Sequence, residues 1–383
     1  MNPKSNGLAC NSKIELRSKE CIDNILRPLV DNIQIPINGS LTSKDIFQTA
    51  ISMAVNKNSI HSVQKRYEKV PCETSLRLHL KKLDLEKLME VNNKILIQKP
   101  IESLKPNKKY EFAIDFTNDP YYGEIDTSNE KYVIRGQAKK STNSFYSYVS
   151  LYIINKNERF TISVLPVEKG KSKVHYLTYF IDLIKSLNFG IKILCLDREF
   201  YSIDVFEFLK ILKIPHITPV VKKGDRIKKI LTGTRNRFDT YLMKNSEKEI
   251  LLDIAIDVKY LKGKRGKKGR ENLGFVVYGI NWNPRKVSTV YRRRFAIESS
   301  YRIRNQVKPN TSTKNVIIRY FYALISFLMK NIWLCLQKKR FTIFQRGPPI
   351  IMEDLFRFDV FLLLIEEWVR RKLKIRIAVK CLR

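Results

Sequence analysis

Two apolar runs, each closed by an aspartate, most constrain what this 383-residue chain can fold into. Residues 110–116 and 191–196 have the length and composition of buried strands. Asp115 and Asp197 stand at the C-terminal ends of these runs. Because an unpaired carboxylate is costly to bury, and open sheets place ligand sites at strand ends, both aspartates are candidate site residues.

The segments around these runs predict a mixed α/β sheet. Strands are expected over residues 145–155, 160–167 and 216–220, and helices over 174–187 and 202–212.

A basic, β-rich stretch, residues 222–285, is expected as an insertion in this core. The core would then comprise residues 108–221 and 286–340. Within the insertion, the dense basic run 262–270 is expected to be a loop or a hairpin tip, because charge runs are usually solvated.

Helical segments flank the core. Residues 1–42 are expected to form a partly helical arm, 43–99 a helical domain, 100–107 a linker, and 341–383 a C-terminal helical segment.

The third helix of the helical domain, expected over residues 73–83, is basic. Three short helices of which the last is basic are typical of a helix-turn-helix unit. We expect Leu78 to face inward and Arg77, His79 and Lys81 to face outward toward DNA. Many small helical domains share this pattern, so packing remains the alternative.

Residues 291–308 contain no proline or glycine and predict one continuous helix. One of its faces would carry the following residues: Tyr291, Arg294, Glu298, Arg302 and Asn305. The opposite face is small and apolar. Arg294 and Glu298, four residues apart, could also be an ordinary surface ion pair.

The net charge of +35, from 72 Lys and Arg against 37 Asp and Glu, favours a polyanionic partner. Nucleic acid is the first candidate, since neutralising phosphates releases counterions. Residues 321–336 are apolar but short of a membrane span, and Lys330 interrupts them, so no membrane partner is expected. The six cysteines show no metal-ligand spacing, which favours a reducing interior.

Asp115, Asp197 and Glu298 together suggest a carboxylate cluster. Carboxylates that converge repel one another unless a cation lies between them. Mg²⁺ or Mn²⁺ suits oxygen ligands, and two such ions would serve phosphodiester transfer.

These motifs resemble the DDE transposases of bacterial and archaeal insertion sequences, in the branch with a Tyr-Arg-Glu-Lys motif. The resemblance covers about residues 108–335. It rests on Asp115-Phe116-Thr117, Pro120-Tyr121-Tyr122-Gly123, Asp197-Arg198-Glu199-Phe200, and Tyr291, Arg294 and Glu298.

The resemblance implies an RNase H-like fold with a β-rich insertion before the glutamate helix. It also implies that Asp115, Asp197 and Glu298 bind metal, and that Tyr291 and Arg294 contact DNA phosphates. The final lysine of the motif is replaced by Asn305, and the substitutes considered are Arg302, Arg304 and Lys308. Arg198 is expected to support the site or touch phosphate.

The sequence therefore predicts a transposase that binds double-stranded DNA, cleaves it at element ends and joins the 3′-ends to a target. A homodimer on DNA, a cytoplasmic, nucleoid-associated location and no small-molecule substrate are expected. The alternatives are an RNase H-like nuclease without strand transfer and a DNA-binding protein with a decayed core.

Overall fold

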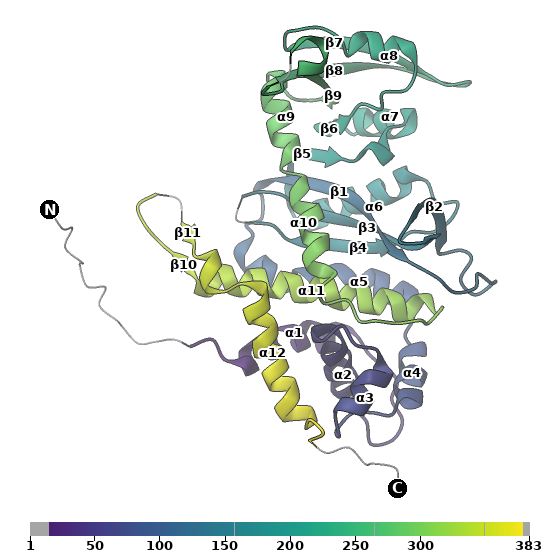
Figure 1. The fold of residues 1–383 in the computed structure, drawn as a ribbon, viewed down its shortest axis with the longest axis vertical. Coiled ribbons are helices and arrows are strands. Elements are labelled where there is room, and N and C mark those ends of the chain that lie inside the picture. Colours follow the sequence, from purple (N-terminus) through teal and green to yellow (C-terminus); the bar gives the residue numbers. More distant parts are fainter. Residues whose placement is uncertain (1–14, 157, 264, 348, 378–383) are drawn as a thin grey trace, which may run out of the picture.

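The structure, a computed structural model, describes residues 15–156, 158–263, 265–347 and 349–377 (Figure 1). The α-helices are α1 (Ser18–Asn32), α2 (Ser43–Val55), α3 (Ile60–Arg66), α4 (Glu73–Lys81), α5 (Leu85–Ile97), α6 (Lys173–Ser186), α7 (Ile203–Ile211), α8 (Asp225–Ile230), α9 (Pro284–Arg292), α10 (Phe295–Arg304), α11 (Val316–Arg340) and α12 (Phe358–Leu373). The 3₁₀ turns are η1 (Pro100–Ser103), η2 (Arg198–Phe200), η3 (Gly266–Gly269) and η4 (Glu353–Leu355). The strands are β1 (Lys109–Pro120), β2 (Val133–Lys139), β3 (Thr142–Ile153), β4 (Thr161–Pro166), β5 (Gly190–Leu196), β6 (His216–Pro219), β7 (Arg237–Lys244), β8 (Glu249–Tyr260), β9 (Arg270–Tyr278), β10 (Thr342–Ile343) and β11 (Ile350–Ile351).

Among the described residues, nine strands form one mixed sheet in the order β2-β3-β1-β5-β6-β9-β8-β7, with β4 also paired to β3. The strands β1, β5 and β6 are parallel, whereas β1 pairs with β3 and β6 pairs with β9 in antiparallel fashion. Strands β7, β8 and β9 come from the basic stretch 222–285 and extend the sheet beyond β6. They form the upper end of the molecule in Figure 1.

Strand β1 is buried on both faces over most of its length, as its largely apolar run predicts. Successive side chains of a strand point to opposite faces. Phe112 and Ile114 belong to the core that includes Leu177 of α6. Ala113 belongs to the other core, together with Ile297 of α10. Asp115, two residues after Ala113, therefore lies on the α10 side of the sheet.

The N-terminal helices share a core with the C-terminal helices, although we expected the ranges 43–99 and 341–383 to be separate. One hydrophobic cluster contains Phe47 of α2, Phe321 of α11 and Phe361 of α12. The backbone joins the same parts, because Glu68 N–H donates to the Lys374 carbonyl at 2.9 Å. Figure 1 shows α12 beside α1 and α2, below the sheet. Helices α1–α5 therefore depend on α11 and α12 for burial.

Helix α4 orients its side chains differently from our expectation. Leu78 is 56% exposed and His79 is 4% exposed, so our inward and outward assignments of these two residues were reversed. The expectation followed an alternating pattern, whereas at about 100° per residue His79 falls about 60° from Leu76, and Leu78 falls about 160° from Leu76, on the opposite side of the helix. Arg77 pairs with Glu73 at 2.6 Å. Lys81 is exposed and remains available for DNA contact, whereas His79 is buried and is not available.

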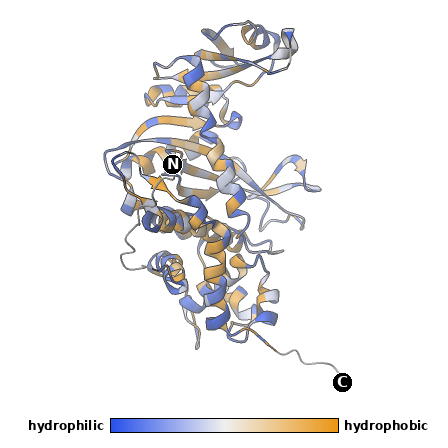
Figure 2. Ribbon diagram, turned by 60° about the vertical axis from the view of Figure 1, so that its left-hand side comes forward, coloured by the Kyte–Doolittle hydropathy of each residue, from blue (hydrophilic) through white to orange (hydrophobic). Residues whose placement is uncertain are grey.

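Helix α11 is long and apolar enough to cross a membrane by length and composition, but 89% of its most apolar window is buried inside the protein. Figure 2 shows hydrophobic residues gathered in the central strands and in the helices beneath them. Helix α11 is therefore a core helix that joins the sheet to the helical end.

Candidate active site

Asp115 and Asp197 are neighbours because of strand register. Strands β1 and β5 are parallel, and Ile114 lies opposite Leu196. The next residue in each segment is an aspartate, so the two carboxylates lie side by side where β5 ends. We expected Asp115 to end its strand, but β1 continues to Pro120, so Asp115 lies within it. Two separate sequence motifs thus meet at one place.

Glu298 comes from α10, on the face of the sheet that carries Asp115. The helix that we expected over residues 291–308 is interrupted, because α9 ends at Arg292 and α10 begins at Phe295. The N–H groups of Arg293 and Arg294 donate to carbonyls three residues earlier, at 2.9 Å each. Hydrogen bonds to the third preceding residue, as in a 3₁₀-helix, are typical of helix ends. The interruption means that one helical wheel does not describe the whole stretch.

Two buried tyrosines fix α9 and α10 against the two aspartate strands. The Tyr291 hydroxyl donates to the Leu196 carbonyl, directly before Asp197, at 3.2 Å. The Tyr301 hydroxyl donates to the Asp115 carbonyl at 3.0 Å and bonds the Ser150 hydroxyl at 2.8 Å. Tyr291 is only 5% exposed, so in this structure it is a positioning residue and does not present its ring to DNA.

Arg294 bridges the three carboxylates. Its guanidinium donates to Asp115 at 2.9 Å and to Glu298 at 3.0 Å, and lies 3.8 Å from Asp197. The side chain is only 7% exposed, which excludes an ordinary solvated surface pair. Its Nε has no hydrogen-bond partner among the described residues. One buried cation thus gathers carboxylates from β1, the end of β5 and α10.

The pKa of the Asp115 carboxylate is strongly perturbed. Burial raises its pKa to about 7, Arg294 opposes the rise, and the nearby charges of Asp197 and Glu298 add to it. Like charges at short range disfavour ionisation, so the cluster needs more positive charge than one arginine supplies.

The donor set fits divalent metal by its chemistry. Three carboxylates face one guanidinium, which leaves about two negative charges when all three are ionised. Oxygen ligands of this kind suit Mg²⁺ or Mn²⁺. In the described part of the chain, however, no three acidic, His or Cys side chains are already grouped closely enough to hold a metal ion. Arg294 lies between these three.

The residues considered in place of the missing lysine lie elsewhere. Arg302 is exposed and donates to the Ser299 hydroxyl at 3.2 Å. Lys308 pairs with Asp119 at 3.1 Å. Asn305 accepts a hydrogen bond from Arg304 at 3.2 Å. Among the described residues, none of them forms a hydrogen bond or an ion pair with the three carboxylates. Arg198, directly after Asp197, is exposed.

The sequence also left a buried ion pair unrecognised. Arg304 is fully buried, and its guanidinium donates to both carboxylate oxygens of Asp119 at 2.8 and 2.9 Å. Its Nε donates to the Ser326 hydroxyl of α11 at 3.0 Å. Asp119 lies within β1. Asp115 and Asp119 are four residues apart on one strand, so their side chains share a face of the sheet. This spacing was the signal in the sequence that could have indicated a second buried acid.

Comparisons with known proteins agree with this geometry. A family model described as a transposase DDE domain matches residues 106–308. No curated protein matches the chain. Among solved structures, the piggyBac transposase synaptic complex with hairpin DNA has a similar fold, with a TM-score of 0.53 and 12% sequence identity. The similarity covers 96% of this chain and 84% of that one.

The match spans more than half of the chain and includes β1, β5 and α10. The mixed sheet with its flanking helices is the RNase H-like fold that the sequence predicted. The chain therefore belongs to the DDE transposase family.

Proposed function

We propose that this protein cleaves DNA at the ends of an insertion sequence and joins the 3′-ends to target DNA. The observation that supports the proposal most directly is the convergence of Asp115, Asp197 and Glu298 on Arg294 from three separate elements. The buried acids Glu111 and Asp119 each pair with two cations, whereas the three carboxylates of this cluster share one arginine and so carry surplus negative charge.

Asp115, Asp197 and Glu298 would hold the divalent ions, expected to be two. Bound there, such ions lower the pKa of a water and stabilise charge on the attacking and leaving oxygens. The protein supplies fixed ligands: Tyr291 and Tyr301 hold the strand ends and the helix in place through backbone carbonyls.

Arg294 would exchange carboxylate contacts for a DNA phosphate. A guanidinium can hold two phosphate oxygens at once, and its charge lies at the centre of the cluster. The net charge of +35 would draw DNA to the protein. We further propose that the protein acts as a homodimer on double-stranded DNA and works in the cytoplasm, associated with the nucleoid.

The test is metal-dependent cleavage of labelled element-end DNA by single variants of the full chain. Asp115→Asn, Asp197→Asn and Glu298→Gln should each abolish cleavage, because each removes one charged metal ligand. DNA binding without metal should stay within about two-fold of wild type. Asp182→Asn, an exposed carboxylate on α6, is the matched control and should cleave normally.

If any one of the three variants cleaves normally, that residue is wrongly assigned. Joining of the labelled 3′-end to a plasmid separates the alternatives. Cleavage without joining would favour a nuclease, and DNA binding without metal-dependent nicking would favour a decayed core.

A further inference from the structure

A pocket of about 470 Å³ lies further along the strand that carries Asp115. It is lined by the end of β1 and by residues that follow β1 and α10, among them Asp119, Tyr122 and Lys308. Asp119 is four residues after Asp115, so both point to the same face, about 13 Å apart along the strand. The pocket is thus a neighbour of the candidate active site, and it contains the Tyr121-Tyr122 motif, to which the proposed cleavage chemistry assigns no role.

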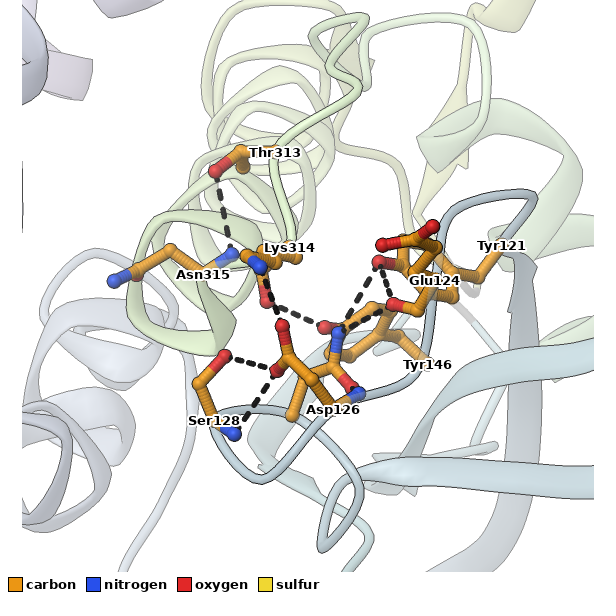
Figure 3. A network of polar contacts seen from close by, with 9 residues as sticks. Tyr121, Glu124, Asp126, Ser128, Tyr146, Thr313, Lys314 and Asn315 are labelled. Atoms are coloured by element: carbon orange, nitrogen blue, oxygen red, sulfur yellow. Dashed lines mark hydrogen bonds and ion pairs between the residues drawn. The ribbon is translucent and has the colours of Figure 1, made fainter.

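Tyr121 is a buried anchor for the loop that follows β1. Its hydroxyl donates to the Glu124 carbonyl at 2.7 Å and accepts from the Asn129 amide at 3.1 Å. Figure 3 shows the contact of Tyr121 with Glu124 beside the ion pair that joins Asp126 to Lys314, two residues before α11. A Cβ at Gly123 would come within 2.6 Å of the Tyr121 hydroxyl, which explains the glycine. The loop is therefore held from inside.

Tyr122 takes the opposite role. Its side chain is 67% exposed, although it is a large aromatic residue beside a pocket. The hydroxyl donates to the Lys140 carbonyl at 2.8 Å, which fixes the direction of the ring. A buried tyrosine thus holds the loop, and the next tyrosine presents a fixed ring to solvent.

The charge around this ring is positive. Lys140, Lys308 and Arg319 line the pocket together with one acid, Asp119. The charge of Asp119 is already balanced by the buried Arg304 behind it. Lys140 is exposed and forms no salt bridge within the described residues. Arg319 stacks on the ring of Tyr146, 4.6 Å from its centre.

We propose that this pocket binds an unpaired nucleotide of DNA, with its base stacked on Tyr122 and its phosphates near Lys140 and Lys308. An aromatic face combined with cations is the recurring means of holding single-stranded nucleic acid. A paired base does not suit this ring, because its neighbours in the duplex cover both of its faces. The inference rests on the proposed function in one respect, that DNA is the natural ligand.

The experiment measures binding by the full chain in EDTA, so that cleavage does not contribute. The probe is a short single-stranded oligonucleotide containing 2-aminopurine, whose fluorescence is quenched when the base stacks on tyrosine. Tyr122→Ala should weaken binding by about five- to 100-fold and abolish the quenching. Tyr122→Phe keeps the ring and should bind within about two-fold of wild type.

Tyr260→Ala is the matched control. Tyr260 is also 67% exposed, and its hydroxyl also donates to a backbone carbonyl, that of Thr234, at 2.7 Å. It lies on β8, away from the pocket, and its loss should leave single-strand binding unchanged. Thermal melting checks that each variant is folded.

Three outcomes would overturn the proposal: normal single-strand binding by Tyr122→Ala, an equal loss of binding to fully paired duplex, or complete displacement of the oligonucleotide by a free mononucleotide. The last would assign the pocket to small nucleotides. Because these titrations contain no metal, failure here is distinct from failure of cleavage by the Asp115, Asp197 and Glu298 variants.

Discussion

Replacing Arg294 by lysine keeps the charge at the centre of the carboxylate cluster and removes its geometry. The guanidinium reaches Asp115 at 2.9 Å, Glu298 at 3.0 Å and Asp197 at 3.8 Å. An ammonium group is a single point of charge on a flexible stem and cannot bridge three partners from one position.

The expected magnitude follows from the hydrogen bonds that a lysine cannot make at this position. If the lysine retains about one of the two short charged hydrogen bonds, the variant loses about 1.5–3 kcal/mol. The same loss applies if the arginine grips a phosphate with two donors in the reacting complex. At 1.36 kcal/mol per factor of ten, cleavage should fall about ten- to 150-fold.

The assay is single-turnover cleavage of labelled element-end DNA over a range of Mn²⁺ concentrations. Metal binding should persist, because all three carboxylates remain. Arg293→Lys is the matched control: this neighbouring arginine pairs with a single carboxylate, Glu111 at 2.7 Å, which a lysine can also reach. Unchanged cleavage by Arg294→Lys would refute the bridging role and leave only an ion pair within α10.

Two further predictions concern stability and binding. Burial alone would raise the pKa of Asp119, but Arg304 and Lys308 outweigh burial and hold that pKa well below its ordinary value. The pair therefore stabilises the fold above about pH 4 and loses this contribution as pH falls further, by about 1 kcal/mol at pH 3. Urea unfolding of wild type and of Asp119→Asn, from about pH 6 to pH 3, measures how the free energy of unfolding changes. An equal decline of that free energy in both proteins would contradict this role of the Asp119 pair. For DNA binding, log K against log salt should fall with a slope steeper than about −3, because the net charge of +35 implies many released counterions; a flat plot would exclude phosphate contacts as the main source of affinity.

The sequence predicted the sheet and its two aspartates because their signal is local. An apolar run such as residues 191–196, closed by Asp197, predicts both a buried strand and a polar strand end. The parallel register that pairs Ile114 with Leu196 could then bring the aspartates together. The strands within residues 222–285 were predicted for the same reason.

The features that the sequence did not predict depend on contacts between distant segments. Periodicity shows that α2 and α12 each have an apolar side, but not that Phe47 and Phe361 share one core. Nor does it show that Tyr301 reaches the carbonyl of Asp115, 186 residues earlier in the chain. His79 was misplaced because alternating leucines over residues 76–80 imitate a strand pattern inside a helix.

Two arginine–aspartate pairs explain why α10 can hold Glu298 at a defined place over the sheet. Arg294 and Arg304 stand at the two ends of α10, and their partners Asp115 and Asp119 are four residues apart on β1. The two pairs therefore tether both ends of the helix to one strand. The pairs are not equivalent: Arg304 is fully buried and anchored also to α11 through Ser326, whereas Arg294 borders the exposed side of the cluster. Because Arg304 and Tyr301 already hold the helix, the exchange that we propose for Arg294, from a carboxylate to a phosphate, would not release Glu298 from its position.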